Sequence, residues 1–486
     1  MSVQDRQSSP QGATDGYKPG IMIVGAGLGG LTLAMLFERL GYPYHVFERA
    51  TKLRPLGSAM TLGPNILPVF EQLGLLEEIE KMSFPCPALE IYNHDNTKFG
   101  SVKLMGRKGT GYDNLLFDRP QLHQLLLRQI PPERVSFGKK VLRVEEQDDR
   151  VFIHCSDNST YEGDILIGAD GAYSGVRQSL YRSLREKGLL PRADSEDFAL
   201  ANICMVGVAD PPNPEKYPQL KDDYSHFSTT LGENMRACTV VSIPGNRVCW
   251  SLTVQLSKAE AKAQHFRNSE WGPESNESMI KEFQDLPCPW GGTMKEIIEA
   301  TPKDLISKVF LEEKMFKTWF HGRTALLGDA CHKMLTGAGQ GAVNAMQDAV
   351  VLANCIYNMP NTRTKSVTAA FGEYYRQRYP QAAQKFNVSK EWSMVMFGQT
   401  FAAKITRHIM VNTPDWLFLR THSRNFAYRP QLAWLPLVEN RGPLPVHPQE
   451  GVRKPLSQRP ILQSRSSTNT AATIEGQEQA AQAEAV

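Results

Sequence analysis

The sequence predicts an α/β fold in which a βαβ nucleotide-binding domain is interrupted by a second domain of mainly antiparallel strands. Three observations support this. A buried strand near the start runs directly into a glycine-rich turn and a helix. Strand-like segments with Pro and Gly between them fill the middle of the chain. Strand-then-helix segments return after residue 323. The first domain is therefore expected to be discontinuous, with the second inserted into it.

The first βαβ unit occupies about 28 residues, a length typical of this motif. Residues 21–24 are an apolar strand, and residues 31–40 carry apolar side chains at helical spacing. Gly41 ends that helix, and residues 44–48 form the next strand.

Further elements follow in order. We expect one amphipathic helix over residues 65–81 and another over 120–129, with Asp118 as its N-cap and Pro120 in its first turn. Residues 141–161 alternate like a hairpin, and residues 164–169 read as a buried strand. In the middle, strand-like segments cover 199–208 and 236–256, and a polar, helical stretch covers 257–283. Residues 324–328 and 340–357 return to a strand and a long helix.

The chain therefore divides into six segments. They are a disordered lead (1–19), the first part of the nucleotide-binding domain (20–195), a substrate domain (196–309), the second part of the nucleotide-binding domain (310–385), a helical C-terminal segment (386–450) and a disordered tail (451–486).

Composition narrows the class of protein. The 486 residues include 54 Lys and Arg against 51 Asp and Glu, which gives no reason to expect a nucleic-acid partner. The eight cysteines form no C-x-x-C pair, so we expect reduced thiols. No apolar run is long enough for a transmembrane span, and residues 1–19 lack the apolar core of a signal peptide. The expected localisation is cytoplasmic.

The C-terminal segment leaves two interpretations open. Apolar residues recur at helical spacing, and basic residues lie between them. The apolar residues are Phe397, Phe401, Ile405 and Ile409, and the basic ones are Lys404, Arg407 and His408. This pattern indicates either ordinary packing or a peripheral membrane contact through residues 391–420.

The glycine-rich turn has the spacing G-x-G-x-x-G between a strand and a helix, in the run Gly25-Ala26-Gly27-Leu28-Gly29-Gly30. Gly25 permits the tight turn, Gly27 lets the backbone approach a pyrophosphate, and Gly30 lets helix and strand pack closely. Glu48 follows 23 residues after Gly25, where an acid can accept the hydroxyls of a ribose. These residues predict a dinucleotide but do not separate FAD from NAD.

Two further motifs make that separation. Asp170-Gly171 follows the strand at 164–169, and Gly328-Asp329 follows the strand at 324–328. With the glycine turn, this "DG" and "GD" pair resembles the class A FAD-dependent monooxygenases of the para-hydroxybenzoate hydroxylase type. Within that family the run from Gly328 to Ala342 is most similar to fungal secondary-metabolite epoxidases and hydroxylases. The resemblance implies FAD as the cofactor and a Rossmann-like FAD-binding domain.

The resemblance also assigns roles to residues at the cofactor. Glu48 would bind the adenosine ribose, Arg119 would reach FAD from a helix start, and Thr61 would contact the cofactor. Asp329 would accept a ribityl hydroxyl. Asp170 would tie the two halves of the FAD site together and contribute to NAD(P)H handling.

Three more assignments concern the flavin edge and the substrate. Gly341 and Ala342 would offer N–H groups at a helix N-terminus to the pyrimidine end of the flavin. Tyr224 lies in the substrate domain, where it either orients or deprotonates a phenol or is a plain strand-face aromatic. Asp348 is expected at the surface or as a structural hydrogen-bond partner.

Two departures from the family fall at the flavin edge, where Thr336 replaces a usual proline and Val343 replaces a frequent asparagine. His332 resembles a zinc ligand only in isolation, because no second ligand follows it at metal spacing in the sequence. No metal is therefore expected.

The implied function is FAD-dependent monooxygenation. NAD(P)H and O₂ would serve to hydroxylate or epoxidise a small aromatic or prenylated substrate through a flavin C4a-hydroperoxide. Thr336 motivates a second interpretation, an FAD-dependent reductase or dehydrogenase on the same scaffold. A third is a flavin-binding module without catalysis.

Overall fold

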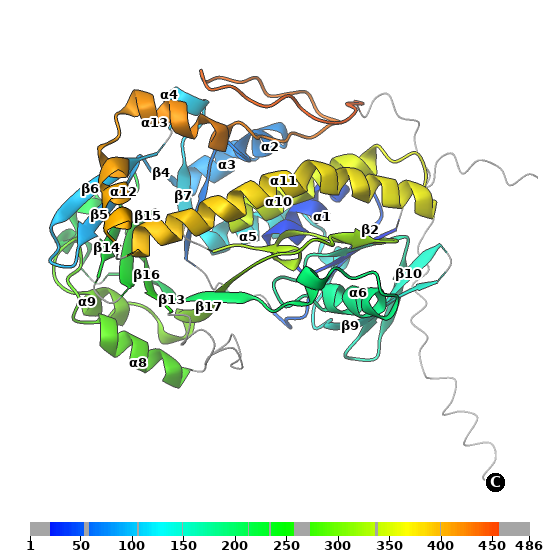
Figure 1. Cartoon of the computed structure of the whole chain (residues 1–486), viewed down its shortest axis with the longest axis horizontal. Helices are drawn as coiled ribbons and strands as arrows, with labels where there is room; N and C mark the ends of the chain where they lie inside the picture. Colours follow the sequence, from blue (N-terminus) through cyan, green and yellow to red (C-terminus); the bar gives the residue numbers. More distant parts are fainter. Residues whose placement is uncertain are drawn as a thin grey trace, which may run out of the picture.

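The computed structural model describes residues 20–52, 58–104, 106–147, 149–211, 213–232, 235–256, 273–335, 339–398 and 400–455. The predicted lead (1–19), residues 456–486 of the predicted tail, and Thr336 lie outside these residues. A six-stranded sheet and an eight-stranded sheet organise the chain, and the long helix α11 runs along the molecule past both (Figure 1).

The bounds of the elements are as follows. The helices are α1 (Leu28–Leu40), α2 (Leu67–Gln72), α3 (Leu76–Lys81), α4 (Arg107–Thr110), α5 (Arg119–Arg128), α6 (Gly175–Glu186), α8 (Pro273–Phe283), α9 (Met294–Glu299), α10 (Gly341–Tyr357), α11 (Thr364–Phe397), α12 (Phe401–Asn412) and α13 (Asp415–His422). The strands are β1 (Ile21–Val24), β2 (Tyr44–Phe47), β3 (Ala59–Leu62), β4 (Phe84–Pro85), β5 (Ala88–Asn93), β6 (Lys98–Lys103), β7 (Leu115–Asp118), β8 (Val135–Ser136), β9 (Val141–Gln147), β10 (Arg150–Cys155), β11 (Thr160–Gly163), β12 (Ile165–Gly168), β13 (Ala199–Ala209), β14 (Phe227–Leu231), β15 (Arg236–Ile243), β16 (Arg247–Gln255), β17 (Ser307–Met315), β18 (Phe320–His321), β19 (Thr324–Leu326) and β20 (His332–Lys333).

The six-stranded sheet has the order β18-β19-β12-β1-β2-β8, and all neighbours except β18 and β19 pair in parallel. All four residues of β1 are buried, as expected of a central parallel strand covered on both faces. Val24 at the end of β1 lies beside Gly168 of β12, and Gly168 lies beside Leu326 of β19. The strands that precede the glycine turn, the DG motif and the GD motif are thus neighbours and end at one edge.

The eight-stranded sheet has the order β20-β17-β13-β16-β15-β14-β5-β6. Helices α8 and α9 cover one face, where Phe283, Trp290 and Met294 pack with Trp250 of β16. Strands β5 and β6 come from within residues 20–195, so the sheet is assembled from segments outside residues 196–309 as well as from that stretch.

The predicted α/β class with an inserted, mostly antiparallel sheet and a helical C-terminal part is confirmed. One predicted element is wrong: the single helix over 65–81 is two short helices, α2 and α3. Gly74 separates them with a φ of 71°, a conformation that continues neither helix. The polar stretch 257–283 is described only from Pro273, where α8 begins.

Two further sequence expectations concern cysteines and membranes. All eight cysteines are free thiols and buried. Across the described part of the chain, no helix combines the length and the apolar character needed to cross a bilayer.

Candidate cofactor and substrate site

The glycine turn shows why three of its positions are glycine. A Cβ on Gly25 would lie 2.4 Å from the carbonyl oxygen of Ala169, and a Cβ on Gly30 would lie 2.1 Å from that of Gly25. Gly27 differs, because a Cβ there would meet no atom within 4 Å. Gly27 is the N-cap of α1, so the first turn of that helix faces open space. This is the place where helix N–H groups and the helix dipole favour a pyrophosphate, and the residues present fit one.

Glu48 follows β2 at the same edge. Its two carboxylate oxygens each accept a backbone N–H, from Ala26 and from Ala50, both at 2.8 Å. Each oxygen keeps a second lone pair, so the carboxylate is held in place and can still accept a hydroxyl. His123 of α5 bonds the Ala26 carbonyl at 2.8 Å through Nε2, and so ties α5 to the turn. No motif in the sequence marks His123, although it lies four residues after Arg119 on the same helix face.

Arg119 begins α5 directly after β7 and lies close to the GD motif. Burial lowers the pKa of Arg119, and the nearby charge of Asp329 acts in the opposite direction. Asp329 forms an ion pair with Lys333, with Nζ and Oδ2 2.7 Å apart. Two residues predicted from separate motifs are therefore neighbours. Lys333 joins them, and no motif in the sequence marks it.

A buried arginine joins the loop that carries Asp170-Gly171 (the DG loop) to the loop that carries Gly328-Asp329 (the GD loop). Arg177, in the first turn of α6, donates to the Ala172 carbonyl at 2.6 Å and to the Ala330 carbonyl at 2.8 Å. Its guanidinium also stacks on the ring of Phe316, 4.3 Å from the centroid. Arg177 therefore joins the two loops, and the predicted role of Asp170 toward FAD stays a prediction.

One carboxylate oxygen of Asp170 accepts a hydrogen bond within the DG loop, and the other has no hydrogen-bond partner among the described residues. Oδ2 accepts the N–H of Val176 at 3.2 Å, whereas Oδ1 is buried and has no hydrogen-bond partner among the described residues. Burial raises the pKa of Asp170, and hydrogen bonds from Ser174 and Val176 act against that shift. An unmatched buried acceptor at this loop fits a bound group that donates to it.

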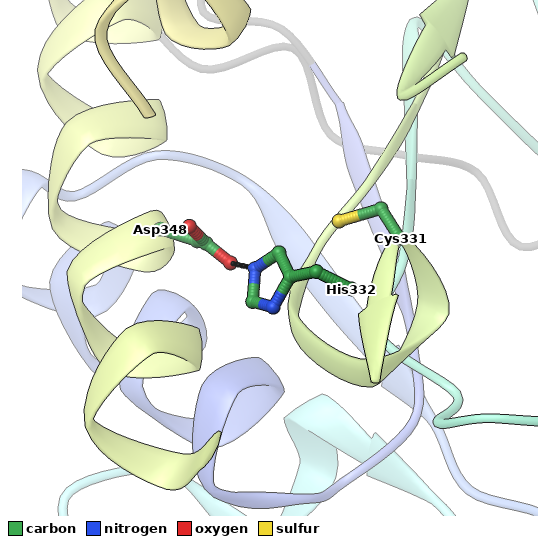
Figure 2. Close-up of side chains that lie close together, drawn as sticks. All are labelled: Cys331, His332 and Asp348. Carbon is green, nitrogen blue, oxygen red and sulfur yellow. Dashed lines mark hydrogen bonds and ion pairs between the residues drawn. The ribbon is translucent and has the colours of Figure 1, made fainter. Parts of the chain in front are cut away.

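A fully buried charge cluster lies behind the GD loop. His332 Nε2 is 2.6 Å from Asp348 Oδ2, and Arg378 Nε is 2.7 Å from Asp348 Oδ1. Asp348 Oδ2 also accepts the N–H of Gly328 at 3.0 Å. Figure 2 shows the His332 ring directed at Asp348 on helix α10. The surface position allowed for Asp348 is wrong, and its role as a structural hydrogen-bond partner is confirmed.

The same cluster overturns one argument about metals. Cys331, His332 and Asp348 bring a thiol, a ring nitrogen and a carboxylate oxygen within 4.8 Å of one another (Figure 2), so spacing in the sequence did not exclude a second ligand. Two features nevertheless disfavour a cation there. Burial raises the pKa of the Cys331 thiol well above its ordinary value, and Arg378 already neutralises Asp348. Burial acts to raise the pKa of Asp348, but the charges of His332 and Arg378 hold it below its usual value.

Helix α10 begins next to the GD loop with Gly341. A Cβ on Gly341 would meet no described atom within 4 Å, so the N-terminal end of α10, like that of α1, is open. Ala342 follows, half-buried, and Val343 is buried in the main core. The departure at Val343 therefore falls on a core-facing position. The other departure, Thr336, lies outside the described residues.

The face of the eight-stranded sheet that α8 and α9 do not cover is directed toward the motif loops at the edge of the six-stranded sheet. Its apolar side chains cluster with Leu116 of β7, Leu335 beyond the GD motif and Met396 of α11. Three small hydroxyl side chains pair across the strands of this face, Thr229, Thr239 and Ser251, and Thr253 on the same face donates to the thiol of Cys204. A surface of this composition suits a mostly apolar ligand with a few polar groups.

Two predicted residues flank this region. Thr61 of β3 pairs with Leu116, which places it next to the sheet face. Tyr224 is 36 % exposed, and its ring lies 4.7 Å from that of His226, which in turn pairs with Asp222. Burial and the nearby charge of Asp222 raise the pKa of Tyr224. A catalytic role for Tyr224 stays a prediction.

The fold and the site together define an FAD-binding α/β enzyme: three motif loops share one sheet edge, and a second sheet faces it. Comparison with known proteins supports this. A family model described as "FAD binding domain" matches residues 19–205 and 293–386. The chain belongs to this family and is an FAD-dependent monooxygenase.

Two similar fungal proteins are also FAD-dependent monooxygenases by name. FAD-dependent monooxygenase paxM of Penicillium paxilli is 31 % identical over 353 residues, covering 70 % of this chain and 69 % of that protein. FAD-dependent monooxygenase ptmM of Penicillium ochrochloron is 28 % identical, covering 76 % of this chain and 87 % of that protein. Among solved structures, Klebsiella pneumoniae HpxO complexed with FAD and uric acid is similar in fold. Its TM-score is 0.68 at 20 % identity, and the match covers 84 % of this chain and 97 % of that one.

Proposed function

We propose that this enzyme uses NAD(P)H and O₂ to hydroxylate or epoxidise a small aromatic or prenylated compound. The observation that carries the proposal is the convergence of the glycine turn, the DG loop and the GD loop on one edge, opposite the hydroxyl-bearing sheet face. FAD, when bound, would supply the hydride-accepting and oxygen-activating chemistry that the side chains of the protein lack. The protein positions the reactants and excludes water.

Each part of the cofactor has a candidate partner. We assign the pyrophosphate to the open first turn of α1 at Gly27 and the adenosine ribose to Glu48. Arg119 and Asp329, which are neighbours, suit the middle of the cofactor, where Asp329 can accept a ribityl hydroxyl. The open N-terminus of α10 at Gly341 would stabilise negative charge at the pyrimidine end of the reduced flavin.

The nicotinamide coenzyme needs a transient site of its own. A cavity of about 580 Å³ lies beside the DG loop and includes Tyr173 and Arg177 in its lining. Arg182 and Arg185, one helical turn apart on α6, lie on the same wall and are exposed. We assign the coenzyme phosphates to these two guanidinium groups, because arginine binds phosphate in a bidentate manner.

The substrate is assigned to the second face of the eight-stranded sheet. Its hydroxyl groups can orient a polar substituent, while the neighbouring apolar side chains accommodate a ring or a prenyl chain. A prenylated compound partitions into lipid, and we therefore include peripheral membrane contact in the proposed function.

Oxygen labelling tests the proposal. Purified, FAD-loaded protein is given NADPH or NADH with a panel of phenols and prenylated aromatics, under ¹⁸O₂. We expect one substrate class to accelerate coenzyme oxidation and its product to gain one labelled atom by mass spectrometry. Substrate turnover without oxygen would instead establish the reductase or dehydrogenase. Flavin that neither coenzyme reduces, with any ligand present, would establish a binding module.

A further inference from the structure

Helix α12 carries its apolar side chains on the outside. Phe401, Ile405 and Ile409, spaced four residues apart, are 79 %, 43 % and 61 % exposed, and Trp416 of α13 is 65 % exposed. The buried side chain of this helix is a cation, Arg407. An amphipathic surface helix of a globular protein buries its apolar side chains and exposes its charged ones. The exposed apolar side chains of α12 therefore indicate a binding surface.

The orientation of α12 is fixed by its inner side. Arg407 donates to the carbonyls of Val395 and Met396, at 2.9 and 2.6 Å, and so satisfies the C-terminal end of α11. Val411 packs against β6 so closely that a Cβ on Gly100 would lie 2.7 Å from its Cβ. Figure 1 shows α12 beside β6 at the end of α11. Rotating the helix to hide its apolar row would break these contacts.

The charge around Phe401, Ile405 and Ile409 indicates what kind of surface these side chains contact. The whole chain is nearly balanced, with 54 basic and 51 acidic residues, but residues 400–430 contain five Lys and Arg and one acid. Lys404 and His408 lie on the exposed side of α12, and Arg420 is exposed on α13. Exposed apolar side chains among basic ones match a lipid surface of negative charge.

We propose that the outer face of α12, together with Trp416 of α13, docks on a bilayer that contains anionic lipid. A second copy of the chain is disfavoured, because a two-fold interface would bring the basic residues of both copies together. This inference rests on the proposed function, which includes peripheral membrane contact, and it assigns that contact to one surface and one class of lipid.

A cavity at the margin of the surface suits a lipid headgroup. It measures about 570 Å³, lies between β6 and the α12–α13 connection, and is lined by Lys103, Asn412, Thr413 and Trp416 among others. Lys103 can attract a phosphate, and the indole of Trp416 suits the level of the headgroups.

Vesicle co-sedimentation of the full-length, FAD-loaded protein tests the proposal. The vesicles are phosphatidylcholine alone or with phosphatidylserine, at low and raised salt. Wild type is expected to bind the phosphatidylserine vesicles at least about tenfold more tightly, and salt should weaken this binding. The variant F401Q/I405Q/I409Q should lose binding to both, and K404E/R420E should lose the preference for phosphatidylserine. Leu189→Gln is the matched control, because Leu189 is 59 % exposed elsewhere on the surface.

Flavin absorbance and coenzyme oxidation in the absence of vesicles verify that each variant is folded and keep this test separate from that of the proposed function. Equal binding of wild type and the triple variant would overturn the proposal, and so would wild-type binding without preference for phosphatidylserine. Sedimentation velocity gives a further outcome: a dimer that the triple variant dissociates would assign the surface to a second copy instead.

Discussion

The two open helix N-termini of the cofactor site, at α1 and at α10, are built in different ways. Most contacts of the turn before α1 come from its own βαβ unit: Ala26 donates to Glu48, 22 residues away, and Gly30 packs on Gly25. Ala169 and His123 add contacts from outside that unit. The GD loop before α10 depends on distant ones. Arg177 reaches Ala330 across 153 residues, and Arg378 reaches Asp348 across 30. The shape of the first turn therefore follows mainly from glycines and an acid within one βαβ unit, whereas the GD loop is held by buried charges from other elements.

The largest expected effect follows from breaking the distant network. Asp348→Asn removes the charge that offsets Arg378, which is fully buried. Loss of one partner of a buried pair should cost about 3–5 kcal/mol of unfolding free energy, measured by urea denaturation. Glu77→Gln, in an ion pair whose side chains are 72 % and 80 % exposed, is the control and should change little. Equal effects of the two substitutions would contradict a structural role for the cluster.

Lys385 is a second buried cation on α11, two turns beyond Arg378. Burial, and then the charge of Arg378, lowers the pKa of Lys385 to about 8. Because the folded-state pKa lies below the unfolded one, protonated Lys385 costs stability below pH 8, and this cost fades as the pH rises toward 10.5. Lys385→Met should therefore stabilise the protein at pH 7, by up to about 3 kcal/mol, and confer less benefit at pH 10.

Thermal unfolding of both proteins across that pH range is the measurement. A difference in Tm between Lys385→Met and wild type that does not change with pH would contradict the lowered pKa of Lys385.

The close packing of Gly30 in the turn before α1 should make the stability of the protein sensitive to a single added methyl group. Gly30→Ala places a Cβ 2.1 Å from the Gly25 carbonyl, within backbone that cannot easily move. Overpacking of this kind costs about 1–3 kcal/mol, and FAD affinity should fall with it. Gly372→Ala on α11 is the matched control, since its Cβ would lie 3.8 Å from Phe320. If both substitutions leave unfolding by urea unchanged, the close packing at Gly30 is not as described.

This contrast also explains what could be predicted from the sequence. The local turn was predicted almost completely, including Glu48, because strand, glycines, helix and acid follow one another directly. For the GD loop the sequence marked Asp329 and Gly341 but not Arg177 or Arg378 as partners. Nothing local in either arginine indicates which carbonyl or carboxylate it meets.

The same limit applies to the sheets. The strands of the βαβ unit were recognised from neighbouring elements, whereas β5 and β6 join the eight-stranded sheet beside β14, more than a hundred residues later. Gly74 was counted into a helix because the apolar spacing continues on both sides of it.

FAD affinity of Gly27→Ala is the most direct test of the central claim, that the open first turn of α1 holds the cofactor pyrophosphate. In the protein without FAD, the added methyl group meets no atom within 4 Å, and Gly27 has an ordinary φ of −74°. Because Gly is preferred over Ala at a helix N-cap, the stability of that form should fall by no more than about 1 kcal/mol. The methyl group would occupy the place of the pyrophosphate and weaken its hydrogen bonds to the backbone, so FAD affinity by titration should fall about 10–100-fold. Unchanged FAD affinity in a folded Gly27→Ala protein would contradict the claim.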